Sequence, residues 1–203
     1  KVAFERVFTF RSGAGTRMDL IVRIYHDGVA FRYTFPECDN LVLTESTTTY
    51  NIPLGIKRWT QKWHESYEDF YPLNTDGTGN NRRGDWGYPA LFEVSDSVFM
   101  LLTEADITRE NCGSWLNNQT DRTRYTIRMQ EDELNCSKGW KSTWNVLIVG
   151  TLADVVESTL VTDVSTPCAI EDTSWIEPGL VSWIYWAYNH GSKDFQIVKK
   201  YID

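Results

Sequence analysis

The chain has 203 residues, of which 41% are hydrophobic and 14% are aromatic, so it carries enough apolar side chain to fill a folded core. Its 28 acidic residues against 20 basic ones give a formal net charge of −8, which argues against a non-specific nucleic-acid binder and against attraction to an anionic membrane. No segment approaches the roughly 18 apolar residues of a membrane span. The composition predicts a soluble globular protein. Its length suits one large β domain or one and a half ordinary domains.

A β-hairpin over residues 18–35 is the clearest predicted element. Apolar residues alternate with polar ones over 20–24 and again over 29–35, and Asp27-Gly28 between them is typical of a tight turn. A second hairpin is predicted where Ser95-Asp96-Ser97 separates two apolar runs. Further strands are predicted at residues 40–52, 124–129 and 144–150. Many short strands with turns between them indicate an all-β sandwich up to about Ser165.

Two other segments interrupt this β pattern. Residues 74–87 form a polar loop with four glycines, and loops of this length are either functional or mobile. Residues 152–158 are predicted to form a short helix, with Thr151 as its N-cap.

The end of the chain has a different character. Residues 180–186 are apolar on both faces, which is typical of a strand covered on both sides in a parallel sheet or barrel. Ser192 is a suitable N-cap, and Phe195, Val198 and Ile202 form one apolar face of a helix. Together they predict the first βα unit of an α/β fold. We therefore expect the chain to be cut inside a second domain, and its start without Met or signal peptide to be that of a cut or processed protein.

An aromatic and acidic cluster within residues 58–72 contains Trp63, Glu65 and Tyr67. Aromatic rings stack on sugar rings and carboxylates bind sugar hydroxyls, so these three residues are candidates for a substrate-binding lip. The alternative is a strand whose aromatic side chains point inward and whose charges are solvated. Composition alone favours that structural interpretation.

Other potentially reactive residues are isolated. Glu104 lies at the end of an apolar strand, where a lone glutamate is most often solvated, and no Asp-x-Asp-x-Asp loop accompanies it. His190 follows the terminal strand, on the face where α/β barrels carry active sites, although a surface histidine is the simpler alternative. The sequence contains no GxSxG motif and no phosphate-binding glycine loop. Four cysteines without CxxC spacing fit either disulfides or reduced thiols: Cys38, Cys112, Cys136 and Cys168.

Several segments together resemble glycoside hydrolase family 97. They are GVAFRYTFP at 28–36, LLTEADI at 101–107, the run 152–186, which is the most specific, and KKYID at 199–203. The resemblance implies a calcium-dependent α-glucosidase or α-galactosidase. Its fold would be an N-terminal β-super-sandwich, similar to galactose-mutarotase-like domains, followed by a (β/α)8 barrel and a small C-terminal β domain.

On this resemblance, residues 1–168 form the super-sandwich, and residues 169–203 form a linker and the first strand and helix of a truncated barrel. The catalytic carboxylates of the family lie on later barrel strands, so none is carried over and the chain alone is expected to be inactive. The missing barrel would be its partner, α-linked glycans its substrates, and the periplasm or the exterior its location.

One functional residue is implied by the family pattern. A glutamate of the N-terminal domain joins barrel carboxylates around calcium in the family, and Leu102-Thr103-Glu104-Ala105 matches that segment, so Glu104 is the expected ligand. Calcium takes about 6 to 8 oxygen ligands, so we expect this chain alone to bind little or none.

Two other functions remain open: a non-catalytic carbohydrate-binding module that uses the cluster around Trp63, and a purely structural domain that supports the barrel. If the chain is cut inside a second domain, as expected, its apolar tail should lack its native cover. We therefore expect it to be disordered, folded back on the sandwich, or shared with a second copy.

Overall fold

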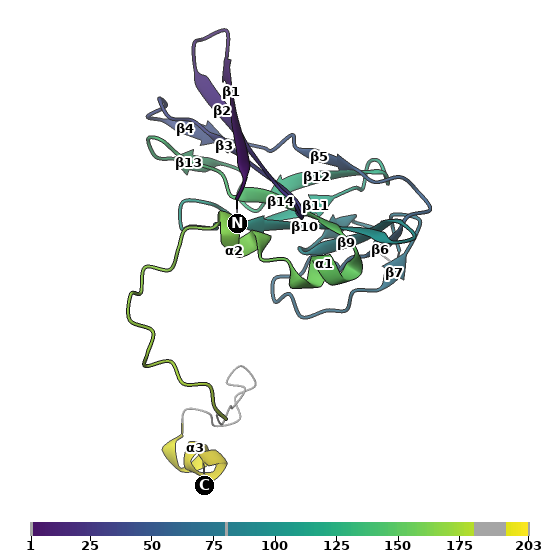
Figure 1. The fold of residues 1–203 in the computed structure, drawn as a ribbon, viewed down its shortest axis with the longest axis vertical. Helices are drawn as coiled ribbons and strands as arrows, with labels where there is room; N and C mark the ends of the chain where they lie inside the picture. Colours follow the sequence, from purple (N-terminus) through teal and green to yellow (C-terminus); the bar gives the residue numbers. More distant parts are fainter. Residues whose placement is uncertain (1, 80, 181–193, 203) are drawn as a thin grey trace. The chain divides into compact units, whose positions relative to one another are not determined.

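The computed structural model describes residues 2–79, 81–180 and 194–202, and these residues form mainly antiparallel β-structure (Figure 1). The strands are β1 (Phe4–Arg11), β2 (Arg17–Tyr25), β3 (Gly28–Thr34), β4 (Leu41–Leu43), β5 (Thr49–Asn51), β6 (Lys57–Trp59), β7 (Leu73–Asn74), β8 (Asp85–Trp86), β9 (Ala90–Ser95), β10 (Val98–Ala105), β11 (Ser114–Asn117), β12 (Arg124–Met129), β13 (Leu134–Cys136) and β14 (Trp144–Gly150). The helices are α1 (Leu152–Glu157), α2 (Leu160–Val164) and α3 (Phe195–Ile202). The predicted mainly β fold class is confirmed.

The strands assemble into three antiparallel sheets. The large sheet has the order β1-β2-β3-β14-β10-β9-β6-β7, the second has the order β5-β12-β11-β8, and β13 pairs with β4 in a small third sheet. Strand β14 pairs with β3 on one side and with β10 on the other. It therefore joins an N-terminal meander to the hairpin of β9 and β10.

Both predicted hairpins are confirmed. β2 pairs with β3 so that Tyr25 lies opposite Gly28, directly beside the predicted turn. A side chain at Gly28 would collide with the carbonyl oxygen of Leu147 on the neighbouring strand, which explains why glycine occupies this position. β9 pairs with β10 around the second predicted turn, with a register shift between Val98 and Phe99.

Two hydrophobic clusters lie on opposite faces of the large sheet. One face packs against α1 and α2, with Val155, Leu160 and Val164 contacting a cluster that includes Trp144. The other face packs against the second sheet through a second cluster of buried residues. This cluster includes Phe92, Leu102, Leu116, Tyr125 and Ile127. The result is a sandwich of two sheets with a pair of short helices on its outer side.

Helix α1 begins where the sequence predicts. The Thr151 hydroxyl accepts a hydrogen bond from the backbone N–H of Asp154 at 3.2 Å, and the Asp154 carboxylate accepts one from the Thr151 N–H at 2.8 Å. This reciprocal pair is a capping box, which satisfies backbone groups that the first helical turn leaves free.

Two strand predictions need correction. Residues 40–52 do not form one strand, because β4 pairs with β13 while β5 pairs with β12 in a different sheet. The chain crosses between sheets here, and the two short strands cannot be continuous. In the aromatic cluster, the strand interpretation holds only for β6, and the following residues form an irregular loop.

The chain divides into two compact units, Lys1–Pro167 and Cys168–Asp203. In the second unit the predicted helix is confirmed as α3, and the carboxylate of Asp194 caps it by accepting hydrogen bonds from the backbone N–H groups of Gln196 and Ile197. The predicted cap was Ser192, so the cap position is corrected to Asp194. The predicted strand beyond Leu180 lies outside the described residues. No helix of the described residues is long and apolar enough to cross a membrane.

Candidate functional site

Glu104 is the penultimate residue of β10 and lies opposite Asn145 of β14. Side chains alternate along a strand, so Glu104 shares a face with Leu102, which is fully buried between the two sheets. A carboxylate on that face must find hydrogen-bond donors, because burial of a bare charge is costly.

Two hydroxyl groups satisfy one oxygen of this carboxylate. Glu104 Oε1 accepts hydrogen bonds from Ser114 Oγ at 2.8 Å and from Thr143 Oγ1 at 3.1 Å. These donors come from the start of β11 and the residue before β14, so three separate segments meet at this point. Among the described residues, no hydrogen bond reaches the second oxygen, Oε2. Glu104 is thus oriented on one side and free to accept a ligand on the other.

The surroundings of Glu104 disfavour charge. Burial raises the pKa of Glu104, and the hydrogen bonds from Ser114 and Thr143 oppose that rise. Three phenols lie within the field of this carboxylate. Burial, and then the negative charge of Glu104, raise the pKa of each one: Tyr50, Tyr67 and Tyr88. The Tyr50 hydroxyl also donates a hydrogen bond to Asn145 Oδ1 at 3.3 Å.

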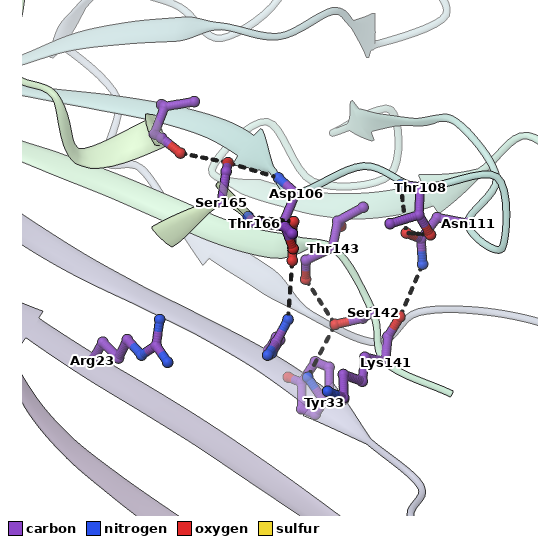
Figure 2. Close-up of polar contacts among 12 residues, drawn as sticks. Arg23, Tyr33, Asp106, Thr108, Asn111, Lys141, Ser142, Thr143, Ser165 and Thr166 are labelled. Carbon is purple, nitrogen blue, oxygen red and sulfur yellow. Dashed lines mark hydrogen bonds and ion pairs between the residues drawn. The ribbon is translucent and has the colours of Figure 1, made fainter. Parts of the chain in front are cut away.

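Asp106, two residues further on, fixes the end of β10. Its carboxylate accepts hydrogen bonds from Arg32 Nη1 at 3.2 Å and from the backbone N–H of Thr166 at 2.8 Å. Figure 2 shows Asp106 beside Ser165 and Thr166. Its own N–H donates to Ser165 Oγ at 3.2 Å, and its φ angle of 56° lies in the left-handed region, which few residues other than glycine adopt. The strand that carries Glu104 is therefore tied to the segment that follows α2.

The candidate lip residues lie in the loop after β6. Trp63 packs on Trp115 of β11, with ring centroids 4.6 Å apart and planes inclined by 34°. Asp85 holds the pair in place, because its backbone oxygen accepts from Trp63 N–H and its carboxylate accepts from Trp115 Nε1 at 2.8 Å. Tyr67 is half-exposed with a φ of 54°, and Glu65 is exposed.

The structure thus brings some of the candidate residues together. Burial, and then the charge of Glu104, raise the pKa of Tyr67, which links the loop after β6 to the carboxylate electrostatically, whereas Glu65 is exposed. His190 lies outside the described residues. Sequence analysis missed Ser114, Thr143 and the phenols of Tyr50 and Tyr88. They come from segments far apart in the chain, and no local pattern marks them.

In its described part, the polar loop at residues 74–87 is tied to the residue after β11 and to itself. Asn118 Nδ2 donates to the backbone oxygen of Gly77 at 2.6 Å, and Asn81 Nδ2 donates to the backbone oxygen of Asp85 at 2.6 Å. All four cysteines carry free thiols.

A metal site built from this chain alone finds little support. The described residues contain no group of three or more His, Cys, Asp or Glu side chains that could hold a metal ion. Glu104 fits the part of a single calcium ligand, because it is an oriented carboxylate with one oxygen free. Calcium requires about 6 to 8 oxygen ligands, so further carboxylates would have to come from elsewhere.

A family described as Glycosyl-hydrolase 97 N-terminal matches residues 2–167. The chain is similar to a protein named probable retaining alpha-galactosidase from Streptomyces bingchenggensis (strain BCW-1). The two are 30% identical over 203 residues, which is 98% of this chain and 31% of that protein. The chain therefore spans about a third of the length of this curated relative.

Two solved structures share the fold. A beta-arabinopyranosidase superposes with a TM-score of 0.73 at 22% identity, over 81% of this chain and 30% of that one. A glycoside hydrolase family 97 enzyme from Pseudoalteromonas sp. strain K8, in complex with acarbose, also has a TM-score of 0.73, at 16% identity, over 88% of this chain and 32% of that one. At these identities the likeness shows the fold alone.

Proposed function

Because this chain belongs to the glycosyl hydrolase 97 N-terminal family, we propose that it is the N-terminal part of a glycoside hydrolase that cleaves α-glycosidic bonds with the assistance of calcium. The observation that supports the calcium role is the geometry of Glu104, whose Oε1 is held by Ser114 and Thr143 while Oε2 is free. The catalytic carboxylates would belong to a barrel domain, so the present chain alone would be inactive.

Each residue of the site would have a distinct part. Glu104 would supply one ligand oxygen, and the Ser114 and Thr143 hydroxyls would hold the carboxylate in one orientation. Calcium, when bound, supplies orientation of the substrate and stabilisation of developing negative charge. Burial, and then the charge of Glu104, raise the pKa of the Tyr50 and Tyr88 phenols, so these two residues belong to the electrostatic environment of the carboxylate.

An α-galactoside is the first substrate to test, because the curated relative is named as an α-galactosidase. An α-glucoside belongs in the same assay, since the family resemblance covers both sugars. A β-L-arabinopyranoside completes the panel, because that sugar has the ring stereochemistry of an α-D-galactoside and lacks the hydroxymethyl group.

The test is to extend the reading frame beyond Asp203 and to assay the longer protein on the p-nitrophenyl forms of these glycosides, with and without EDTA. We expect hydrolysis by the longer protein, loss of activity in EDTA and restoration by calcium, with no activity from the present chain. Glu104→Gln should raise the calcium concentration needed for half-maximal activity by about tenfold or more, since a charged ligand becomes neutral. Unchanged activity in EDTA would contradict the calcium role.

A second candidate function is a carbohydrate-binding module. The packed pair of Trp63 and Trp115, beside the half-exposed Tyr67, provides an aromatic surface on which a sugar ring could stack. If this surface is the main site, the present chain should bind immobilised α-galactosides. Trp63→Ala or Tyr67→Ala should abolish that binding, and Trp175→Ala, at an exposed tryptophan of the second unit, should not.

A periplasmic or secreted location completes the proposal, since an enzyme for external glycans must meet them outside the cytoplasm. Fractionation of cells that express the longer protein from its own gene tests this location. Recovery in the cytoplasm would contradict it.

A further inference from the structure

Three of the four cysteines lie in segments of the first unit that meet around Trp140. They are Cys38, Cys112 and Cys136. The indole N–H of Trp140 donates to the backbone oxygen of Glu110 at 2.9 Å, two residues before Cys112. Phe35, three residues before Cys38, donates its N–H to the backbone oxygen of Trp140 at 3.0 Å, and the two ring centroids are 6.3 Å apart. The fold therefore gathers thiols that are far apart in the sequence.

Hydrogen bonds on both sides of Cys112 tie it to the strand that carries Cys136. Asn111, the residue before it, donates from Nδ2 to the backbone oxygen of Lys141 at 2.9 Å (Figure 2). The residue after it accepts a hydrogen bond at its backbone oxygen from the N–H of Gln130 at 2.8 Å. Strand β13 lies in the sequence between these two partners, and Cys136 is its last residue. Cys112 is therefore anchored to the chain just before β13 and to the chain just after it.

The two thiols differ in their access to solution. Cys136 is buried, whereas Cys112 is partly exposed. Leu134 and Cys136 project from one face of β13, because side chains alternate along a strand. Leu134 and Cys112 line the same cavity, so that face of β13 is directed toward the cavity that Cys112 lines. A reagent from solution would meet Cys112 before Cys136.

Cys136 is a weak nucleophile in the reduced chain. Burial raises the pKa of its thiol to about 11, and the charges of Cys112, Cys38 and Glu110 act in the same direction. A hydrogen bond from the backbone of Leu43 opposes this rise. The thiolate is the reactive form of cysteine, and few Cys136 side chains carry it at neutral pH. A mixed disulfide formed on Cys112 should therefore last long enough at neutral pH to be captured.

We propose that Cys112 and Cys136 form a redox pair, which closes to a disulfide by exchange with a small disulfide such as glutathione disulfide. The Cys112 thiolate attacks one sulfur of that reagent, and one glutathione leaves as a thiolate. Cys136 then gives up its proton to water, its sulfur bonds to Cys112 Sγ, and the second glutathione leaves as a thiolate. Two cysteine thiols are oxidised while one external disulfide is reduced to two thiols, so the electrons balance.

Closure of this pair would act on the start of β11. The disulfide would enclose a loop of about 25 residues that holds β11 and β12. Ser114, which donates to Glu104, lies two residues after Cys112 and would be fixed to the third sheet. Formation of the bond needs neither calcium nor a barrel domain, so the inference goes beyond the proposed hydrolase function. Such bonds persist in oxidising compartments.

The present chain tests the pair directly. The reduced chain is equilibrated with glutathione disulfide at a fixed concentration of reduced glutathione, the remaining thiols are blocked with N-ethylmaleimide, and tryptic peptides are measured by mass spectrometry without reduction. Cleavage after Lys and Arg places the two cysteines on separate peptides, 110–122 and 129–138. We expect these two peptides to be linked to each other, while the exposed Cys168 of the second unit takes up glutathione instead.

Cys136→Ser removes the buried thiol, and Cys38→Ser is the matched control, because Cys38 is the third thiol of the group. We expect Cys136→Ser to accumulate glutathione on Cys112 without any link, and Cys38→Ser to form the link within about twofold of the wild-type rate. Thermal unfolding checks that each variant is folded. If Cys136→Ser is not, Cys112→Ser replaces it. There Cys136 should take up glutathione at least about tenfold more slowly than Cys112 does in the wild type, since it is shielded and weakly ionised.

Two further measurements on the wild-type chain report on the closed pair. Its melting temperature should exceed that of the reduced chain by about 6–12 °C, as expected for closing a loop of this length. The mixed disulfide on Cys112 should close about tenfold faster for each pH unit between about pH 7 and pH 9, since the pKa of Cys136 lies near 11.

Several results would overturn the proposal. These are absence of the link at every concentration of glutathione disulfide, a link from peptide 129–138 to Cys38 in place of Cys112, and loss of the link in Cys38→Ser. A link that forms without a gain in melting temperature would show that it does not fix the start of β11. None of these results depends on hydrolysis by the longer protein, so the redox pair and the catalytic proposal fail separately.

Discussion

Arg58 has no exposed surface, and oxygen atoms other than carboxylates satisfy its guanidinium group. Nη1 donates to the Tyr125 hydroxyl at 3.0 Å, Nη2 to the backbone oxygen of Pro53 at 2.7 Å, and Nε to the backbone oxygen of Ile56 at 3.1 Å. The planar fork of arginine reaches all three acceptors at once, which a lysine ammonium on a single stem does not.

Substitution of Arg58 should therefore be severe even when the charge is kept. We expect Arg58→Ala to lower the free energy of unfolding by about 2–4 kcal/mol, because it leaves buried acceptors without donors and opens a void. Arg58→Lys should lower the free energy of unfolding by at least half of that amount. Urea denaturation measures both variants, and wild-type stability in Arg58→Lys would show that the fork geometry is unimportant.

The raised pKa of Glu104 makes the stability of the fold depend on pH. A carboxyl whose pKa is higher in the folded state binds protons more tightly when folded, so its contribution to stability is lost as pH rises through the folded value. Glu104→Gln removes this titration and keeps an oxygen that can accept from Ser114 and Thr143. We expect the variant to be more stable than wild type at neutral pH, with the difference shrinking toward about pH 4, where the carboxyl takes up its proton.

Thermal unfolding of the present chain at the two pH values measures this difference. A gain of about 2–4 °C at neutral pH would correspond to about 1 kcal/mol for a chain of this size. A variant that is equally destabilised at both pH values would show that burial of the charge is fully compensated in the native state.

At the scale of elements, Glu104 near the end of β10 and Asp106 just after it have carboxyl groups whose pKa values shift in opposite directions. Burial by itself would raise the pKa of Asp106, but hydrogen bonds from Thr166 and the charge and hydrogen bond of Arg32 lower it overall. A depressed pKa stabilises the fold above the ordinary value, and that contribution is lost as pH falls through the folded value. The tie between β10 and the segment after α2 should therefore weaken in acid.

Asp106→Asn tests this tie, because asparagine tolerates a positive φ and lacks the charge. We expect it to lower the free energy of unfolding by about 1–2 kcal/mol at neutral pH, as for a part-buried ion pair, and to match wild type in strong acid. Asp106→Ala should remain destabilised at every pH because it also pays for the strained backbone. A constant deficit in Asp106→Asn across pH would mean that the ionic contact with Arg32 contributes nothing.

Local patterns predicted those elements whose contacts are themselves local. The hairpin turn, which falls at His26-Asp27, one residue before the predicted Asp27-Gly28, the strand pair around Asp96 and the capping box at Thr151 each depend on residues within a few positions of one another. In contrast, β11 is four residues long and α2 is rich in β-branched residues, so packing rather than propensity decides both.

Of the candidate site around Glu104, sequence analysis singled out only the glutamate itself. Glu104 follows from the family pattern, whereas Ser114, Thr143 and Tyr50 reach it through the pairing of strands far apart in sequence. The loop after β6 was predicted as a longer strand because its aromatic residues suit one. In the structure Trp63 instead packs on Trp115, which no spacing in the sequence indicates.

At the scale of the whole molecule, apolar residues of the second unit lie on its surface. Phe195 of α3 is 73% exposed and Ile202 is 68% exposed, and Trp175 is 68% exposed. Exposed apolar side chains mark interaction surfaces in folded proteins when they gather in a patch. Of the three outcomes expected for the tail, sharing with a second copy would cover these side chains, and we propose that one for testing.

Light scattering after size-exclusion chromatography tests self-association. We expect dimers or larger species at micromolar concentration, and a shift toward the monomer when Phe195 and Ile202 are both replaced by Ser. The matched control replaces Val7 and Phe8 of β1, exposed in the first unit, by Ser. A monomeric wild-type chain would contradict the proposal, and so would dissociation by the β1 control alone.

The position of β14 between β3 and β10 has a consequence for synthesis of the chain. The meander of β1 to β3 and the hairpin of β9 and β10 leave the ribosome first, yet neither edge finds its partner until residues 144–150 have emerged. Until then two bare strand edges are exposed in one nascent chain, which is the arrangement that favours aggregation and recruits chaperones. Folding of the large sheet is therefore expected to be a late and cooperative event that depends on β14, the last strand of that sheet to be made.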